Sequence, residues 1–105
     1  MDAIVIQTTT ASLEEAELIA EALLGEGLAA CVQTAPVRSR YVWKGAVERA
    51  DERLMLIKTR ADLFEPVRAR IRALHSYETP EIVATAIVAG DPDYLAWIAG
   101  VTRET

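Results

Sequence analysis

Two side chains that can bind transition metals occur once each in this sequence, His75 and Cys31. His75 opens the stretch HSYETPE, in which Tyr77 supplies a phenol and Glu81 a carboxylate. Cys31 lies in AACVQT, and no CxxC pair accompanies it. Thiolate and imidazole groups suit copper or zinc. Cys31, His75 and Glu81 are therefore candidate metal ligands, if folding or another subunit brings them together.

Each metal candidate also has a structural interpretation. Cys31 has small neighbours in an expected strand, where a cysteine is most often a buried hydrophobe. His75 falls in the last turn of an expected helix, where an imidazole interacts favourably with the negative end of the helix dipole. The sequence leaves both alternatives open, with a metal or proton-transfer role on one side and packing or capping on the other.

Three further residues could contact a small ligand: Trp43, Lys58 and Tyr77. Trp43 alternates with Tyr41 along an expected hairpin, so the two rings share a face and could stack on a planar ligand or anchor a subunit contact. Lys58 is a charge within the apolar segment LMLIKT. It either contacts an anion or extends to solvent from the end of a strand.

Composition excludes several classes of function. Sixteen acidic and eleven basic residues give a net charge of -5, which opposes binding to nucleic acid. The segment MDAIVIQTTT has no basic region and too short an apolar run for a signal peptide or membrane span, so we expect a cytoplasmic protein. The lone cysteine agrees with a reducing compartment. No phosphate loop, HExxH motif or nucleophile–base pair can be named, so we expect no enzymatic activity.

Hydrophobic periodicity predicts the elements that position these residues, within a single domain spanning 1–105. The expected strands are 3–9, 28–43, 46–60 and 80–90, and the expected helices lie within 10–27, 61–75 and 91–101. Their order is that of an α+β, ferredoxin-like βαββαβ fold with a C-terminal helix.

The helices carry recognisable start signals. Ser12 and Glu15 form an expected capping box in the first helix, before Gly25 and Gly27 end it. The residues expected to share its buried face are Leu13, Ala16, Ala20, Leu23 and Leu24. In the second helix, Asp62 and Glu65 are the expected caps and Pro66 lies in the first turn, with Leu63, Phe64, Val67, Ile71 and Leu74 on one face. Asp91 is the expected N-cap of the third.

The second and third strands form an expected hairpin around Lys44-Gly45, with arms of about a dozen residues or more, whereas strands usually have about 3–10. Pro36 implies an edge position or a bulge in the first arm. Arms of this length overhang the domain and expose unpaired edges, so self-association is expected. The segment LMLIKT looks covered on both faces, which places Met55 in a subunit contact.

The segments ACV, YVWKG, LIKTR, LHSYETPEI and GDPDYLAWI, in this order, resemble the CutA divalent-cation-tolerance family over nearly the whole chain. Ser76 and Thr79 depart from the family's usual His-Pro-Tyr-Glu-Val-Pro-Glu pattern. The resemblance implies a homotrimer of ferredoxin-like subunits joined through long hairpins, similar in shape to PII signalling proteins. It places the six candidates on signature positions of the family: Cys31, Trp43, Lys58, His75, Tyr77 and Glu81.

We therefore expect a trimeric cytosolic protein of divalent-cation tolerance, which binds copper, another divalent cation or a small ligand near its subunit boundaries. No cofactor is expected to be required for folding. The alternative is a PII-like signalling or scaffolding trimer with no metal site, in which the same residues serve packing.

Overall fold

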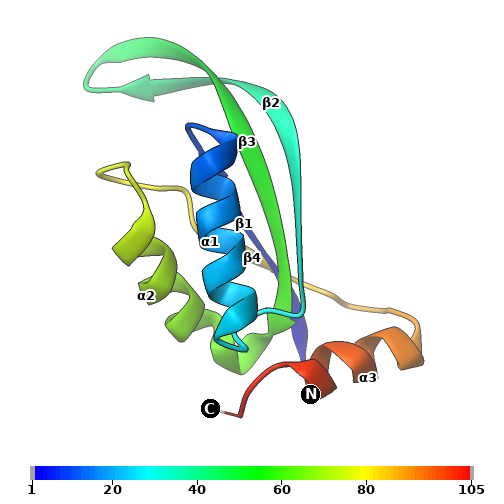
Figure 1. The fold of residues 1–105 in the computed structure, drawn as a ribbon. Coiled ribbons are helices and arrows are strands. Elements are labelled where there is room, and N and C mark those ends of the chain that lie inside the picture. Colours follow the sequence, from blue (N-terminus) through cyan, green and yellow to red (C-terminus); the bar gives the residue numbers. More distant parts are fainter. Residues whose placement is uncertain (1, 105) are drawn as a thin grey trace.

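The computed structural model describes residues 2–104, which form a four-stranded sheet with two helices packed on one face (Figure 1). The elements are β1 (Ala3–Thr10), α1 (Leu13–Gly25), β2 (Cys31–Trp43), β3 (Ala46–Arg60), the 3-10 turn η1 (Ala61–Leu63), α2 (Phe64–Leu74), β4 (Val83–Ala86) and α3 (Pro92–Val101). The strand order is β2-β3-β1-β4, and every neighbouring pair is antiparallel. The expected ferredoxin-like order with a C-terminal helix is confirmed.

The core lies between the sheet and the two helices α1 and α2. Ile6 of β1 and Ile57 of β3 are directly paired and fully buried, in one cluster with Ile19 of α1 and Ile71 of α2. Burial of each such side chain stabilises the fold by about 1.5–3 kcal/mol. Because side chains alternate along a strand, every second residue of β1 and β3 points away from the helices.

We call the other side of the sheet the open face. Strand register places on it the residues Val5, Gln7, Cys31, Gln33, Leu54, Leu56, Lys58, Val83 and Thr85. No helix covers most of this side, and only α3 borders one end of it (Figure 1). One chain covers only one face of LMLIKT, so its coverage on both faces stays a prediction that depends on a subunit contact. Met55 belongs to the core beneath the helices, whereas Leu54 and Leu56 are half-buried on the open face.

Helix α1 begins and ends as its sequence dictates, with one exception. Ser12 Oγ accepts a hydrogen bond from the Glu15 N–H at 3.2 Å, as an N-cap does. The Glu15 carboxylate, however, accepts from the N–H of Ser76, so the reciprocal half of the predicted capping box is absent. At the other end, Gly27 has φ of 70° and Leu28 N–H donates to the Leu23 carbonyl, which is a Schellman motif.

Helix α2 starts differently from the prediction. It follows the turn η1, and its N-cap position makes no side-chain hydrogen bond. Asp62 instead pairs with Arg60, and Glu65 pairs with Arg68, so neither carboxylate caps the helix. Pro66 is the third helical residue, in the first turn as expected, where a missing backbone donor costs least.

The hairpin of β2 and β3 is long and regular. Lys44 and Gly45 have φ of 49° and 82°, so both take the positive values that a type I′ turn requires. Pairing runs without interruption from Cys31 to Trp43, and Pro36 therefore lies on the sheet's edge strand without a bulge. Beyond the last residues that pair with β1, the hairpin overhangs the core and curves over it (Figure 1).

Strand β4 is much shorter than the predicted segment 80–90, because its only neighbour is β1. Ile4 of β1 pairs with Ala86, and the Ile87 N–H donates to the Ala3 carbonyl at 3.0 Å. At that point the chain has reached the start of β1. Residues after Ile87 have no strand left to pair with, and they lead instead into α3.

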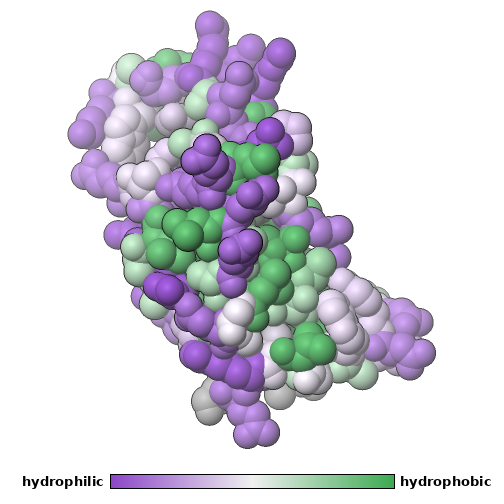
Figure 2. Space-filling model, viewed as in Figure 1, coloured by the Kyte–Doolittle hydropathy of each residue, from purple (hydrophilic) through white to green (hydrophobic). Residues whose placement is uncertain are grey.

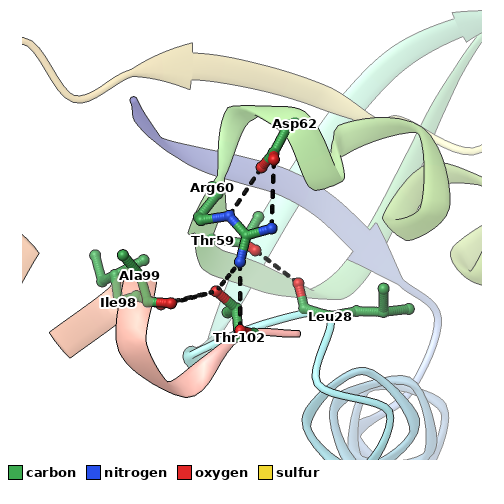
Figure 3. A network of polar contacts seen from close by, with 7 residues as sticks. All are labelled: Leu28, Thr59, Arg60, Asp62, Ile98, Ala99 and Thr102. Carbon is green, nitrogen blue, oxygen red and sulfur yellow. Dashed lines mark hydrogen bonds and ion pairs between the residues drawn. The ribbon is translucent and has the colours of Figure 1, made fainter. Parts of the chain in front are cut away.

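A buried polar network fixes α3 against the end of β3 (Figure 3). The Arg60 guanidinium donates to both carboxylate oxygens of Asp62 and to the hydroxyl and carbonyl of Thr102. The Thr102 hydroxyl in turn donates to the Ile98 carbonyl at 2.9 Å. Asp91 Oδ2 accepts from two N–H groups in the first turn and is the predicted N-cap. Both ends of α3 are therefore held in place.

The outer surface of the helical side is mixed in polarity. Figure 2 shows hydrophilic residues over much of the hairpin end and hydrophobic surface over the middle of the molecule, divided by a column of hydrophilic residues. Across residues 2–104, no helix combines the length and apolar composition that a membrane-spanning helix needs.

Candidate functional site

The segment that follows α2 is tied down by its own side chains. His75 Nε2 lies 2.7 Å from the Thr9 carbonyl oxygen, and His75 Nδ1 accepts the Tyr77 N–H at 3.0 Å. A backbone N–H can only donate, so Nδ1 carries no proton and Nε2–H donates to Thr9. The next residue, Ser76, donates its N–H to Glu15 at 2.8 Å.

These bonds decide what His75 does in a single chain. Its ring contacts the end of β1 and the backbone of Tyr77, and it does not bond to the last carbonyls of α2 as a dipole cap would. Both ring nitrogens are engaged, so a metal ion could be bound only after one backbone hydrogen bond breaks. His75 thus has a structural role: its backbone N–H caps the C-terminus of α2 by donating to the Ile71 carbonyl at 2.8 Å, whereas its ring joins the helix end to β1 and not to the helix carbonyls.

Tyr77 joins this segment to the hairpin. Its hydroxyl donates to Glu52 Oε2 at 2.6 Å, and Glu52 is only 7% exposed. Burial of the phenol, together with the hydrogen bond to Glu52, raises the pKa of Tyr77 above the ordinary value for tyrosine. The phenol therefore stays protonated at neutral pH and donates to the buried carboxylate.

A groove of about 900 Å³ lies between the hairpin and the segment 76–81. Tyr41 and Trp43 line it from β2, and Tyr77 and Glu81 line it from the segment. At the tip of the hairpin, Lys44 Nζ lies 5.6 Å from the centre of the Trp43 ring and 3.9 Å from a carboxylate oxygen of Glu78. Three of the six candidates thus share one concave surface, with aromatic rings and charges of both signs.

Glu81 is held at the border between this groove and the sheet. Its Oε2 accepts a hydrogen bond from Gln7 Nε2 at 2.8 Å. Gln7 belongs to the open face, directly opposite Leu56 of β3. An exposed carboxylate that is oriented but not neutralised in this way can still accept a cation or a ligand's donor group.

The remaining two candidates lie on the open face. Cys31 of β2 is directly opposite Lys58 of β3, and its thiol is half-buried and free. Lys58 Nζ lies 3.4 Å from the hydroxyl of Tyr94, in the first turn of α3. The Tyr94 ring is 5.5 Å from that of Trp97, and both are partly exposed.

Sequence reasoning did not select Tyr94 or Trp97. They lie three residues apart in the C-terminal helix, so they share a side of it and are 39% and 43% exposed. The sequence feature that could have selected them is the pair of large aromatic residues on one face of the expected helix, since exposed apolar surface often marks a binding site.

Within residues 2–104 of one chain, no three or more His, Cys, Asp or Glu side chains are placed to hold a metal ion. Cys31, His75 and Glu81 therefore do not form a single site inside one chain. Their role as metal ligands stays a prediction, which now requires donors from more than one subunit.

The fold and site define a ferredoxin-like α+β protein with an overhanging hairpin, an aromatic groove beneath it and an uncovered sheet face. The chain belongs to the CutA1 divalent ion tolerance protein family, whose model matches residues 4–101.

Individual relatives agree with this assignment over most of this chain. The divalent-cation tolerance protein CutA of Archaeoglobus fulgidus is 47% identical over 93 residues, which cover 89% of this chain and 91% of the relative. The crystal structure of CutA1 from Oryza sativa matches with a TM-score of 0.97 at 36% identity, covering 100% of this chain and 97% of that one. The Archaeoglobus fulgidus structure, named as a periplasmic divalent cation tolerance protein, has a TM-score of 0.93 at 44% identity and covers 94% and 97%.

Proposed function

We propose that this protein is a cytosolic homotrimer that acts in divalent-cation tolerance and binds a divalent cation or small ligand near its subunit boundaries. It acts by binding and not as an enzyme, and it folds without a cofactor. The observation that carries the proposal is membership of the CutA1 divalent ion tolerance family across residues 4–101.

The sheet gives a physical reason for assembly. Strands β2 and β4 form its two outer edges, and each has one side without a strand partner among the described residues. An unpaired edge is a template for another chain. The two edges differ, so contact between them is head-to-tail, and such a contact gives a closed ring when the rotation between copies closes and an open filament when it does not. Three is the number of subunits that the family resemblance implies.

The open face and the hairpin tip supply apolar surface for the same contact. Leu54 and Leu56 lie on the open face beside Val83, which is exposed. At the hairpin tip, Val42 and Val47 pair with each other and are 73% and 69% exposed. A second copy of this chain would remove these side chains from water.

We place the cation site at the boundary between neighbouring chains. Cys31 is the first residue of β2, and Glu81 lies two residues before β4, so one donor belongs to each free edge. Contact of β2 in one copy with β4 in the next would bring both edges to one boundary. A thiolate and a carboxylate there suit copper or zinc. His75 keeps its two backbone hydrogen bonds, to Thr9 and Tyr77, and holds the start of the segment that carries Glu81.

Calorimetric titration of the assembled protein with Cu²⁺ and with Zn²⁺ tests this proposal. We expect saturable binding that is weaker in Cys31→Ser and Glu81→Gln and unchanged in His75→Ala. Glu21→Gln, which removes an exposed carboxylate of α1, is the matched control. Affinity should fall between about pH 7.5 and 5.5, because protons compete with the metal for its ligands. Equal affinity in wild type and Cys31→Ser would contradict the proposed ligand set.

A PII-like signalling or scaffolding trimer without a metal site is the second candidate. It is favoured by the lack of a three-donor cluster within residues 2–104 and by the groove that holds Trp43 and Tyr77. For that function, the same titration gives no stoichiometric metal signal while the trimer persists.

The cellular location is part of the proposal. The free thiol of Cys31 suits a reducing compartment, whereas the Archaeoglobus fulgidus relative is named periplasmic. Fractionation of the source cells, with a periplasmic marker as control, tests the location directly. Recovery in the periplasmic fraction would contradict a cytosolic protein.

A further inference from the structure

Lys58 occupies an unusual position for a lysine. It lies half-buried on β3, an inner strand. Its neighbours across the sheet are Val5 and Cys31, and neither is an acidic residue. A Cys31 thiolate that binds a metal ion would be neutralised by that cation and not by Lys58. The next residue toward the hairpin on the same face is Leu56. The ammonium group thus lies in mostly uncharged surroundings.

Five cations of the chain have a carboxylate partner, whereas Lys58 has none among the described residues, as is also true of Arg40, Arg49, Arg53, Arg72 and Arg103. Arg60, Arg68 and Arg70 each have a carboxylate within 3.0 Å, and even the exposed Lys44 has one at 3.9 Å. Within residues 2–104, no carboxylate lies within ion-pair distance of Lys58 Nζ, whose side-chain partner is the neutral hydroxyl of Tyr94. Lys58 Nζ also lies 5.4 Å from the centre of the Tyr94 ring, and this cation–π contact offsets its charge only in part. Lys58 therefore has no formal counter-charge within the described chain.

Assembly of the protein would make the unpaired charge of Lys58 unfavourable. If the open face is covered by further copies of the chain, as proposed above, water is removed from the Lys58 ammonium. An unpaired charge taken out of water is strongly destabilising, so it requires a counter-charge. The carboxylates at the margins of the open face are oriented by other residues, because Glu52 accepts from Tyr77 and Glu81 accepts from Gln7, and neither forms an ion pair with Lys58 within the described chain.

The groups around Lys58 are suited to an oxyanion. An ammonium offers three donors, and the Tyr94 hydroxyl accepts one of them while its own hydrogen stays available to donate. The exposed ring of Trp97 beside Tyr94 offers an apolar surface to the body of a ligand. Two donors and an aromatic wall thus converge on one end of the open face.

We infer that the assembled protein binds an oxyanion at Lys58 and Tyr94, in the form of a carboxylate or phosphate group of a small molecule. This inference rests on the proposed assembly. In a separate chain water can hydrate the Lys58 ammonium, whereas in the assembled protein it could not. It adds an anion site on the sheet to the cation site proposed at the subunit boundary.

The chain offers a matched pair of variants, because Lys44 and Lys58 are its only lysines. We would titrate wild type, Lys58→Met, Tyr94→Phe and the control Lys44→Met by calorimetry, with inorganic phosphate and with citrate, at constant ionic strength. We expect saturable binding of at least one probe to wild type and to Lys44→Met. Affinity should fall by about tenfold or more in Lys58→Met and by a smaller factor in Tyr94→Phe. A preference for phosphate or for citrate would identify the source of the oxyanion.

Several outcomes would overturn the inference. A trimeric wild type that binds neither probe leaves the proposed function intact and removes the anion site. A monomeric wild type in light scattering removes the assembly, and the anion site with it. If Lys58→Met weakens the trimer but leaves probe affinity unchanged, Lys58 is neutralised by a carboxylate of another copy.

A second measurement covers the case in which Lys58→Met fails to assemble. Reductive methylation with ¹³C-formaldehyde labels the two lysines and retains their charge, and Lys44→Met assigns the two side-chain signals. A phosphate- or citrate-dependent shift of the Lys58 signal alone supports the site. Equal shifts of both signals, or no shift of Lys58, would overturn it.

Discussion

The two faces of the sheet are built from the same strands but differ in what completes them. On the helical face, Ile6, Met55 and Ile57 are fully buried by α1 and α2 within one chain. On the open face, Leu54 and Leu56 from the same strand β3 stay half-buried. Successive residues of LMLIKT therefore serve two different contacts, one inside the chain and one available to other chains.

The difference explains why β3 is apolar on consecutive positions. A strand with one face in water usually alternates between apolar and polar residues, whereas a strand buried on both faces does not. The segment LMLI of β3 has the composition of a strand buried on both sides, although its own chain covers only one. The composition of the open face thus indicates that a second surface belongs against it.

Core truncation should give the largest effect and should separate the two faces. Met55→Ala removes buried volume under the helices and should lower the free energy of unfolding by about 2–5 kcal/mol. Leu54→Ala, one residue away on the open face, should cost clearly less in the separated chain. Urea unfolding of both variants at low protein concentration is the measurement. Equal losses would show that the two faces are buried alike within one chain.

A charge on the open face should act on assembly and leave the chain folded. Leu56→Asp places a carboxylate between Gln7 and Gln33, in the middle of the surface proposed for contact. The new carboxylate lies beside Lys58, and both charges must lose their hydration when another copy covers this face, so we expect the association constant to fall by more than about tenfold. Leu18→Asp, at a position of α1 that is exposed to solvent, is the control and should assemble normally. An intact oligomer with Leu56→Asp would place the contact elsewhere.

Loss of the Arg60 network should have an intermediate effect, because it holds α3 at the border of the open face. Arg60→Met leaves Asp62 and the Thr102 carbonyl without their donors. Loss of these hydrogen bonds should lower the free energy of unfolding by about 1–3 kcal/mol. The loss is limited because the Asp62 carboxylate is partly exposed and can be hydrated instead. Hydrogen exchange should rise first in α3. Uniform exchange across all helices would contradict a local role.

The smallest predicted effect concerns the bond between Tyr77 and Glu52, outside both faces. Tyr77→Phe removes the donor to a buried carboxylate and should cost about 1–2 kcal/mol near pH 7. The raised pKa of Tyr77 adds a test at high pH. Above about pH 10 the unfolded chain releases the phenolic proton and the folded chain retains it, so stability falls by at most about 1.4 kcal/mol per pH unit.

Urea unfolding of wild type and Tyr77→Phe measures this dependence. The titration runs from about pH 8 to about pH 11, on either side of the ordinary tyrosine pKa of about 10. Part of the alkaline loss in wild type should be absent from Tyr77→Phe, because phenylalanine has no proton to release. Tyr41→Phe controls for the general effect of removing a phenol. Identical pH profiles in all three proteins would show that Tyr77 is not protected by Glu52.

The order of the elements and the hairpin could be predicted from the sequence, because local signals determine them. Lys44-Gly45 and the caps Ser12 and Asp91 act over a few residues. The buried face of α1 was less well predicted, since Leu13 and Leu24 are exposed and Ile19 is buried instead. Apolar residues occur on more than one side of α1, and only packing against the sheet selects among them.

The site depends on contacts between distant parts of the chain, and these left no local signal. His75 bonds to a carbonyl 66 residues away, which the pattern HSYETPE cannot show. Lys58 and Tyr94 are 36 residues apart and meet because the Arg60 network holds α3 against β3. The sequence could name Lys58 as an unusual charge, but the fold was needed to show that its carboxylate partner is missing.

The mass of the wild-type protein in solution tests the central claim, that the open face is made to be covered by copies of this chain. Light scattering after size exclusion at micromolar concentration should give about three times the chain mass of 11.5 kDa, and Leu56→Asp should shift it downward. A wild-type mass of 11.5 kDa would contradict the account.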